Sequence, residues 1–160
     1  MSKRRVASAT CLAAVTATAA VLLTVAGPAS GRTALDGPGT IRITDRLVRH
    51  IHVRGPSTKT NAGNLDFYRQ QLFNKGITPR PIGHSDITCV NTGTGSSNCT
   101  GTYFLPEGKI MVGGVIASRL FYELAVFGGT GVYDNVKGTL TVTFLGGQRA
   151  QEFLIFRLEV

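Results

Sequence analysis

The sequence predicts an all-β domain, and three observations lead to that prediction. Apolar and polar residues alternate over 41–53 (IRITDRLVRHIHV), a pattern typical of a long strand with one buried face. After Pro81, short runs rich in β-branched and aromatic residues follow one another closely and are separated by turn residues. No stretch after residue 31 carries the apolar stripe of an amphipathic helix.

The elements follow in order along the chain. Residues 41–53 form the first predicted strand, 54–64 (RGPSTKTNAGN) a loop, and 67–73 either a short helix or an irregular edge strand. Six further strands are expected, at 83–92, 99–105, 109–116, 121–128, 137–145 and 151–159. The turns between them are predicted at Pro106–Gly108, Ala117–Ser118, Gly128–Gly131 and Gly146–Gly147.

Short strands at even spacing indicate either a sandwich or a closed barrel. We favour the barrel, because closure removes the exposed strand edges that invite aggregation. With 41–53 and 67–73 included, the count reaches about eight, which encloses an interior just wide enough for packed side chains or one small ligand.

The first 31 residues read as a secretory signal peptide. Basic residues 3–5 precede an uncharged run at 6–26, and small residues follow it. A membrane anchor is the alternative, because such a run is long enough to span a bilayer. The many Ala and Thr residues favour cleavage after Gly31, so we expect a secreted protein with no membrane contact after cleavage. The mature chain then has a mobile arm at 32–40 and one barrel domain at 41–160.

The formal net charge of the chain is +8. The Lys and Arg residues are dispersed and do not cluster with aromatic residues, as a nucleic-acid surface would require. We therefore expect no nucleic-acid partner.

Cysteine usage agrees with export. Cys11 lies in the leader, which leaves Cys89 and Cys99 on either side of the turn-like segment VNTGTGSSN. A disulfide across the base of this hairpin is predicted, contributing about 2.5–3 kcal/mol on a chain-entropy estimate. A pair of free thiols is the alternative. No metal site is expected, because the two cysteines lack the spacing of a zinc knuckle.

The glycine cluster Gly128, Gly129 and Gly131 raises the question of a phosphate-binding loop. No Lys-Ser or Lys-Thr follows the last glycine, and no helix follows it either. We therefore expect these glycines at a turn at a barrel corner, where they supply positive φ and close backbone approach.

Two histidines and two tyrosines are the candidate chemical groups. His50 and His52 lie two residues apart on one strand and therefore share a face. They are either a general base or a pair of metal ligands, or they are polar residues on the solvated face opposite Ile51. Tyr122 shares a face with Leu124, where its phenol is either a hydrogen-bond donor in a pocket or a structural group. Tyr103 is expected in the core.

The segment YELAVFGGTGVYDNVKGTL resembles the signature of plant dirigent proteins and a segment of allene oxide cyclases. The motifs GHSDITCV, GTYFLPEGKIMVGG and GGTG extend the resemblance to secreted actinobacterial proteins with an allene-oxide-cyclase-like barrel, over most of residues 65–145. The resemblance implies an eight-stranded antiparallel barrel with a largely apolar pocket. It further implies that the pocket holds a reactive small molecule and controls the stereochemistry of ring closure or coupling, without a cofactor.

The resemblance also nominates site residues. Cys89 matches a pocket cysteine of the cyclases, but it has a potential partner in Cys99. The Glu-Leu pair of the dirigent segment is matched, whereas Tyr122 replaces the arginine that precedes it. No glutamate stands on the first strand, where the cyclases use one, and His50 is nearest to it by strand parity. We take Tyr122 and His50 as catalytic candidates, and Tyr103, Leu124 and Val126 as pocket residues.

Two functions remain open from the sequence. The barrel either steers the cyclisation or stereoselective coupling of a small hydrophobic molecule, or binds such a molecule without converting it. Apolar residues on both faces of the last strand, with Leu154, Phe156, Leu158 and Val160 expected to point outward, predict a homo-oligomer. The resemblance implies a dimer or a trimer.

Overall fold

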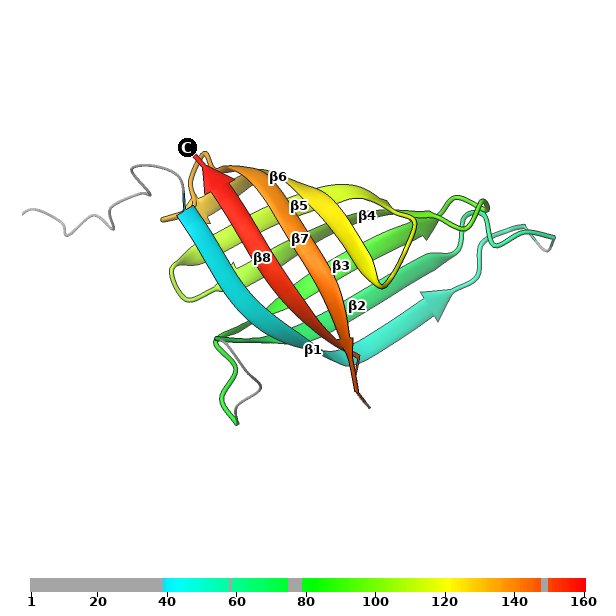
Figure 1. Cartoon of the computed structure of the whole chain (residues 1–160). Coiled ribbons are helices and arrows are strands. Elements are labelled where there is room, and N and C mark those ends of the chain that lie inside the picture. The colour runs from blue at the N-terminus through cyan, green and yellow to red at the C-terminus, as the bar shows by residue number, and fades with distance from the viewer. Residues whose placement is uncertain (1–38, 58, 75–78, 148–149) are drawn as a thin grey trace, which may run out of the picture. The chain divides into compact units, whose positions relative to one another are not determined.

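The computed structural model describes residues 39–160 apart from 58, 75–78 and 148–149. Its strands form a closed barrel in which each strand pairs antiparallel with the next in sequence, and the last pairs with the first (Figure 1). The strands are β1 (Gly39–Val53), β2 (Leu65–Phe73), β3 (Gly83–Asn91), β4 (Ser97–Leu105), β5 (Gly108–Ile116), β6 (Phe121–Gly131), β7 (Lys137–Gly146) and β8 (Gln151–Glu159). The predicted all-β, eight-stranded antiparallel barrel is confirmed.

Most strand bounds agree with the expectation within a few residues. β1 begins at Gly39, so the last two residues assigned to a mobile arm pair with β8. The ambiguous segment at 67–73 belongs to β2, whose inward positions carry the polar Asp66 and Gln70 and thus hide the strand pattern. The predicted signal peptide and the rest of the arm lie outside the described residues. No helix in the described part of the chain has the length and hydropathy to cross a membrane.

One end of the barrel is filled by its own side chains, and we call it the packed end. Leu154, Phe156 and Leu158 of β8 are each at most 1 % exposed and point inward, so the expectation that they form an outward apolar face is wrong. Each such burial stabilises the fold by about 1.5–3 kcal/mol. The turn after β6 closes this end with Tyr133 and Val136, which are both buried.

A β-bulge in β1 reverses which residues of that strand face inward. Before the bulge, odd positions such as Ile43 and Asp45 are buried. The pairing with β2 then shifts between Leu47 and Arg49, and the strand bends there (Figure 1). Because one extra residue exchanges the two faces of a strand, Ile51 and Val53 are 40 % and 45 % exposed, contrary to the predicted alternation over the whole strand.

The glycine cluster lies within β6, so the prediction of a turn at Gly128, Gly129 and Gly131 is wrong; the turn follows it at 132–136. The predicted close approach is present, because a Cβ on Gly129 would lie 2.2 Å from the carbonyl oxygen of Tyr133. Gly131 alone of the three has a positive φ, of 71°. The cluster therefore lets the chain fold tightly over the packed end.

Candidate functional site

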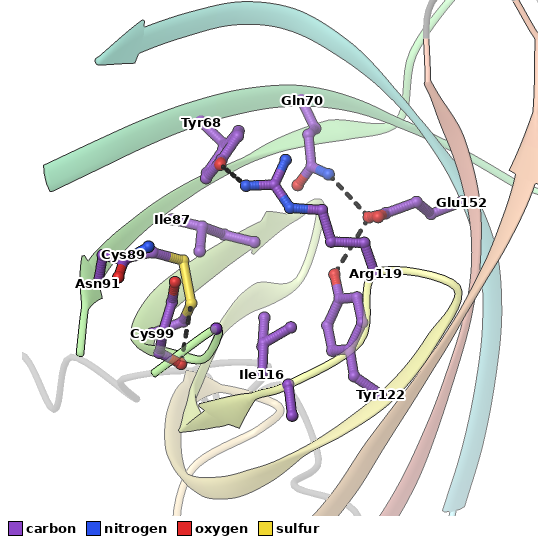
Figure 2. A pocket seen from close by; sticks show the side chains of 13 residues that line it. Tyr68, Gln70, Ile87, Cys89, Asn91, Cys99, Ile116, Arg119, Tyr122 and Glu152 are labelled. Carbon is purple, nitrogen blue, oxygen red and sulfur yellow. Dashed lines mark hydrogen bonds between the residues drawn. A yellow bond between two sulfur atoms is a disulfide. The ribbon is translucent and has the colours of Figure 1, made fainter. Parts of the chain in front are cut away.

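The opposite end of the barrel, which we call the cavity end, encloses a cavity of about 220 Å³. Its walls come from β2, β3, β4, β5, β6 and β8 and from the loop before β6 (Figure 2). The lining combines apolar groups, among them Ile87 and Ile116, with polar ones. The remaining lining residues are Tyr68, Gln70, Cys89, Asn91, Gly95, Ser97, Cys99, Ala117, Arg119, Tyr122 and Glu152.

Glu152 is the acidic residue among those that line the cavity. Its Oε2 accepts hydrogen bonds from the Tyr122 hydroxyl at 3.2 Å and from Gln70 Nε2 at 3.1 Å (Figure 2). The Gln70 amide is itself oriented, because its oxygen accepts a hydrogen bond of 2.7 Å from the Ser85 hydroxyl. Burial raises the pKa of Glu152, although the hydrogen bonds from Tyr122 and Gln70 and the charge of Arg119 oppose that rise.

Asp45 faces Glu152 across the β1–β8 pair and lies deeper in the barrel. It is completely buried, and neither of its carboxyl oxygens has a hydrogen-bond partner among the described residues. Burial and the nearby charge of Glu152 raise the pKa of Asp45 to about 9. The backbone of Glu152 approaches the Asp45 carboxyl group and lowers this pKa in part, but it does not form a hydrogen bond with it. Asp45 is therefore neutral at physiological pH.

The Tyr103 hydroxyl is buried nearby and also has no partner among the described residues. Burial raises the pKa of both Tyr103 and Tyr122, so both phenols keep their protons. Tyr122 and Glu152 thus line the cavity, Asp45 and Tyr103 are fully buried nearby, and burial raises the pKa of all four groups.

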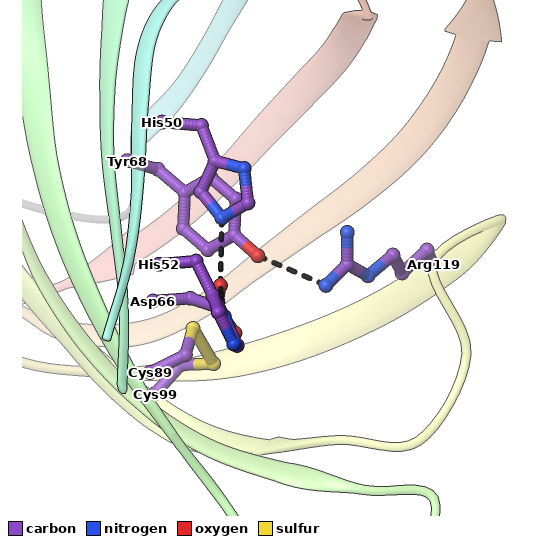
Figure 3. A network of polar contacts seen from close by, with 7 residues as sticks. All are labelled: His50, His52, Asp66, Tyr68, Cys89, Cys99 and Arg119. Atoms are coloured by element: carbon purple, nitrogen blue, oxygen red, sulfur yellow. Dashed lines mark hydrogen bonds and ion pairs between the residues drawn. A yellow bond between two sulfur atoms is a disulfide. The ribbon is translucent and has the colours of Figure 1, made fainter. Parts of the chain in front are cut away.

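A second polar cluster lies at the mouth of the barrel (Figure 3). His50 Nε2 and His52 Nδ1 lie 2.6 Å and 2.9 Å from the same oxygen of Asp66. The His50 ring stacks on Tyr68 with 4.6 Å between ring centroids. Burial by itself would raise the pKa of Asp66, but the hydrogen bonds from the two histidines outweigh burial and lower that pKa. This carboxylate therefore stays ionised.

Arg119 joins the mouth to the cavity. It comes from the loop between β5 and β6, and its side chain reaches across to Tyr68, as Figure 2 shows. Its Nη2 donates a hydrogen bond of 2.9 Å to the Tyr68 hydroxyl, and the guanidinium carbon lies 5.7 Å from the centre of that ring. Arg119 and Asn91 line both the cavity and the wider opening outside it.

The disulfide between Cys89 and Cys99 forms part of the cavity wall (Figure 2). The two cysteines are paired directly opposite each other on β3 and β4, which confirms the predicted disulfide. Cys89 thus lies in the pocket wall, as the resemblance implied, but it has no free thiol.

Solved structures with similar barrels identify the fold. A pyocyanin demethylase is 22 % identical with a TM-score of 0.64, over 75 % of this chain and 99 % of that one. A pterocarpan synthase dirigent protein is 15 % identical with a TM-score of 0.64, over 76 % of this chain and 88 % of that one. The chain has the barrel fold of the dirigent proteins.

An exo-specific intermolecular Diels-Alderase has the same dirigent-like barrel, at 14 % identity and a TM-score of 0.61, over 77 % of this chain and 98 % of that one. No protein-family model and no curated protein sequence matches the chain. The resemblance to dirigent-like and allene-oxide-cyclase-like barrels is therefore confirmed at the level of the fold.

The structure separates the residues that the sequence nominated. Tyr122 lines the cavity of this dirigent-like barrel, whereas His50 lies at its mouth. Leu124 and Val126, expected in the pocket, are at most 3 % exposed and belong to the packed core below it; so does Tyr103, as its expected core position requires, although it was also named as a pocket residue. They share the inward face of the pocket residues but lie further along their strands, so neighbouring side chains cover them.

His50 and His52 lie opposite Ile51 with side chains 39 % and 43 % exposed, which agrees with the interpretation as polar residues on a solvated face. The bulge in β1 turns both histidines toward the mouth, where they contact Asp66 rather than bulk solvent alone. In the described part of the chain, no group of three or more His, Cys, Asp or Glu side chains is arranged to hold a metal ion.

Several residues in or near the cavity were not singled out from the sequence. Asp45 could have been found, because an acid among the inward odd positions of a strand is unusual. Glu152 shares strand parity with Leu154 and Phe156, and it was missed because these residues were expected to point outward. Arg119 lies in a loop, where no periodicity indicates which way a side chain points.

Proposed function

We propose that the barrel binds a small hydrophobic molecule in its cavity and steers its cyclisation or stereoselective coupling without a cofactor. The observation that carries the proposal is an acid whose pKa is raised by burial, Glu152, which accepts hydrogen bonds from Tyr122 and Gln70 in the wall of a partly apolar cavity. Barrels of the same fold include a dirigent protein and a Diels-Alderase, which makes such chemistry compatible with this architecture.

Confinement supplies the first part of the mechanism. A cavity of about 220 Å³ restricts a flexible substrate to few folded conformations. When binding holds the reacting atoms at near-attack geometry, the entropy that the uncatalysed reaction loses on reaching its transition state has already been lost on binding. Rigid barrel walls bearing Ile87, Ile116 and the disulfide favour one face of the substrate over the other.

Glu152 supplies the second part. Tyr122 and Gln70 both donate to Oε2, which leaves Oε1 to carry the acidic proton toward a substrate oxygen. A proton or hydrogen bond delivered where negative charge develops lowers the barrier to ring closure or addition. Asp45, which is paired with Glu152 across β1 and β8, is neutral and adds no negative charge beside it.

Enantiomeric excess tests this function. The protein is offered achiral diene and dienophile pairs, and phenols with an added one-electron oxidant, and chiral chromatography measures the products. We expect Glu152→Gln to abolish the excess and Tyr122→Phe to reduce it, whereas Glu159→Gln, at an exposed position of the same strand, leaves it unchanged. His50→Gln is expected to have a smaller effect, because His50 lies at the mouth.

Racemic products throughout, together with a stoichiometric hydrophobic molecule that is extracted unchanged from the purified protein, would favour the second function. The barrel would then be a binding protein without catalytic activity. Equal loss of excess in Glu159→Gln and Glu152→Gln would remove the role proposed for Glu152.

We also propose that the protein is secreted. The disulfide between Cys89 and Cys99 supports this, because such bonds persist in oxidising compartments. Mass spectrometry of protein recovered from the culture medium should find a chain that begins at Arg32. A full-length chain retained in the cells would contradict both export and the cleavage position.

Self-association is proposed on the outer apolar surface of β1, β2 and β3. Ile51 and Phe67 are cross-strand neighbours there, 40 % and 38 % exposed, and Val53 and Val90 extend the surface. Analytical ultracentrifugation should find a dimer or trimer that Phe67→Ser shifts toward monomer. A wild-type monomer at all concentrations would contradict the proposal.

A further inference from the structure

The opening outside the cavity is lined mainly by basic and neutral polar groups. Its described lining includes three permanently cationic side chains, from Arg54, Lys59 and Arg119, and one carboxylate, from Asp66. His50 and His52 also line it and both contact that carboxylate. The opening therefore has a surplus of positive charge where a ligand must enter.

Arg119 is the cation nearest to the cavity, and its charge is not matched by a carboxylate. Among the described residues it forms no ion pair with an acidic side chain, and its one hydrogen bond there is to the Tyr68 hydroxyl. A guanidinium has five N–H donors in a rigid fork that fits a carboxylate with two of them. Most of the donors of Arg119 thus remain available at the entrance.

Glu152, the acid in the cavity wall, forms no close ion pair with Arg119. Its carboxyl instead accepts hydrogen bonds from Tyr122 and Gln70, and burial raises its pKa, although the charge of Arg119 opposes that rise. The cavity thus has a cation at its mouth, apolar groups such as Ile87 and Ile116 in its walls, and a hydrogen-bonded acid further in.

We propose that the molecule held in this cavity is a small hydrophobic acid whose carboxylate pairs with Arg119 at the mouth. Its apolar body then lies against Ile87, Ile116 and the disulfide, and its uncharged far end meets Glu152. The inference rests on the proposed function in that it names the substrate class of the same cavity. It concerns binding, however, and is tested without turnover.

The charge at the opening gives the pairing a second role. Like charges around a cleft raise the local concentration of an oppositely charged ligand and its rate of association. Pairing with Arg119 also fixes which end of the substrate enters first, and this determines which of its atoms reaches Glu152. Anchoring at the mouth thereby sets the orientation that stereochemical control requires.

Two isosteric probes, 2-naphthoate and its neutral amide 2-naphthamide, separate charge from shape. Isothermal titration calorimetry at low ionic strength should find 2-naphthoate bound about tenfold more tightly by the wild-type protein, as expected for one charge-assisted contact. Arg119→Gln should reduce the affinity for 2-naphthoate to that for the amide and leave the affinity for 2-naphthamide unchanged. Added salt should weaken only 2-naphthoate.

Arg42→Gln is the matched control, because it removes the same charge from an exposed position on β1 near the packed end. It should change neither affinity. Equal binding of the two probes by the wild-type protein, or equal weakening of both by Arg119→Gln, would overturn the acid assignment while leaving a ligand-binding lumen. Binding of neither probe would overturn the lumen proposal as well.

Discussion

The two ends of the barrel use the same eight strands but differ in what their inward side chains are. At the cavity end, Gln70, Tyr122 and Glu152 project polar groups into open space. On each of these strands the next inward residue belongs to the packed end, where Leu72, Leu124 and Leu154 are at most 1 % exposed. A step of one inward position therefore separates the core from the candidate site.

This difference indicates that stability and chemistry are located separately. The packed end buries most of the large apolar side chains, which provide the main driving force for folding. The cavity end instead buries carboxyl groups and phenols, which oppose folding unless they stay neutral or find partners. Substitutions at the two ends should therefore have different consequences.

The largest effect on stability is expected at the packed end. Phe156 is fully buried and packs edge-on against Tyr103, with 5.1 Å between ring centroids. Phe156→Ala should lower the free energy of unfolding by about 3–5 kcal/mol, because it removes apolar burial and leaves a void. Urea denaturation measures the loss, and the exposed Val115→Ala serves as control, expected within about 0.5 kcal/mol of wild type.

The disulfide should contribute the next largest amount, although it lies at the cavity end. Replacing both Cys89 and Cys99 by Ala should lower the free energy of unfolding by about 2.5–3 kcal/mol. The reason is that the unfolded chain gains conformational entropy when the short loop between the two cysteines is no longer closed. A reductant should destabilise the wild type and leave the double variant unaffected. An unchanged midpoint in the double variant would contradict this estimate.

Asp45 should make the protein less stable as the pH rises. Its pKa is raised from 3.8 to about 9 on folding, so between those values the unfolded state loses a proton that the folded state keeps. In this window the free energy of unfolding falls by about 1.4 kcal/mol per pH unit. Asp45→Asn should remove this dependence, and denaturation at pH 7 and pH 8 measures the difference. The same slope in both proteins would assign the effect to other groups.

The smallest change in stability is expected from Tyr122→Phe. It removes one hydrogen bond to Glu152, a loss of about 1 kcal/mol or less. Because the Tyr122 hydroxyl lowers the pKa of Glu152, the variant should raise that pKa further. Carbon-detected NMR titration of the Glu152 carboxyl measures the direction, and a lower pKa in the variant would contradict the arrangement described.

The sequence predicted the barrel well because strand signals depend on local residue patterns. Alternation, turn residues and the disulfide pair all depend on neighbours within a hairpin, and those features agree with the structure. The pattern is weakest in β2, where Asp66 and Gln70 face inward for reasons set by distant strands. A local pattern does not indicate a polar interior.

The candidate site was predicted only in part for the same reason. Tyr122 was found from its strand face, but the depth at which the lumen opens depends on the stagger of all the strands together. Tyr103, Leu124 and Val126 were therefore assigned to a pocket that ends just above them. The hydrogen-bond partner of Tyr122, Glu152, comes from β8, and Gln70, which bonds the same carboxyl group, comes from β2; both strands are remote from Tyr122 in sequence.

The bulge in β1 shows how much depends on a single inserted position. Beyond it, His50 and His52 point toward the entrance and Ile51 and Val53 point away. Deletion of Val48 would remove the bulge and restore regular pairing between β1 and β2. The two histidines would then exchange faces with Ile51 and Val53, so that aliphatic side chains would surround the entrance and imidazoles would lie on the outer wall. One residue more or less in β1, with the other residues unchanged, thus decides whether the entrance is hydrated or lined by hydrocarbon.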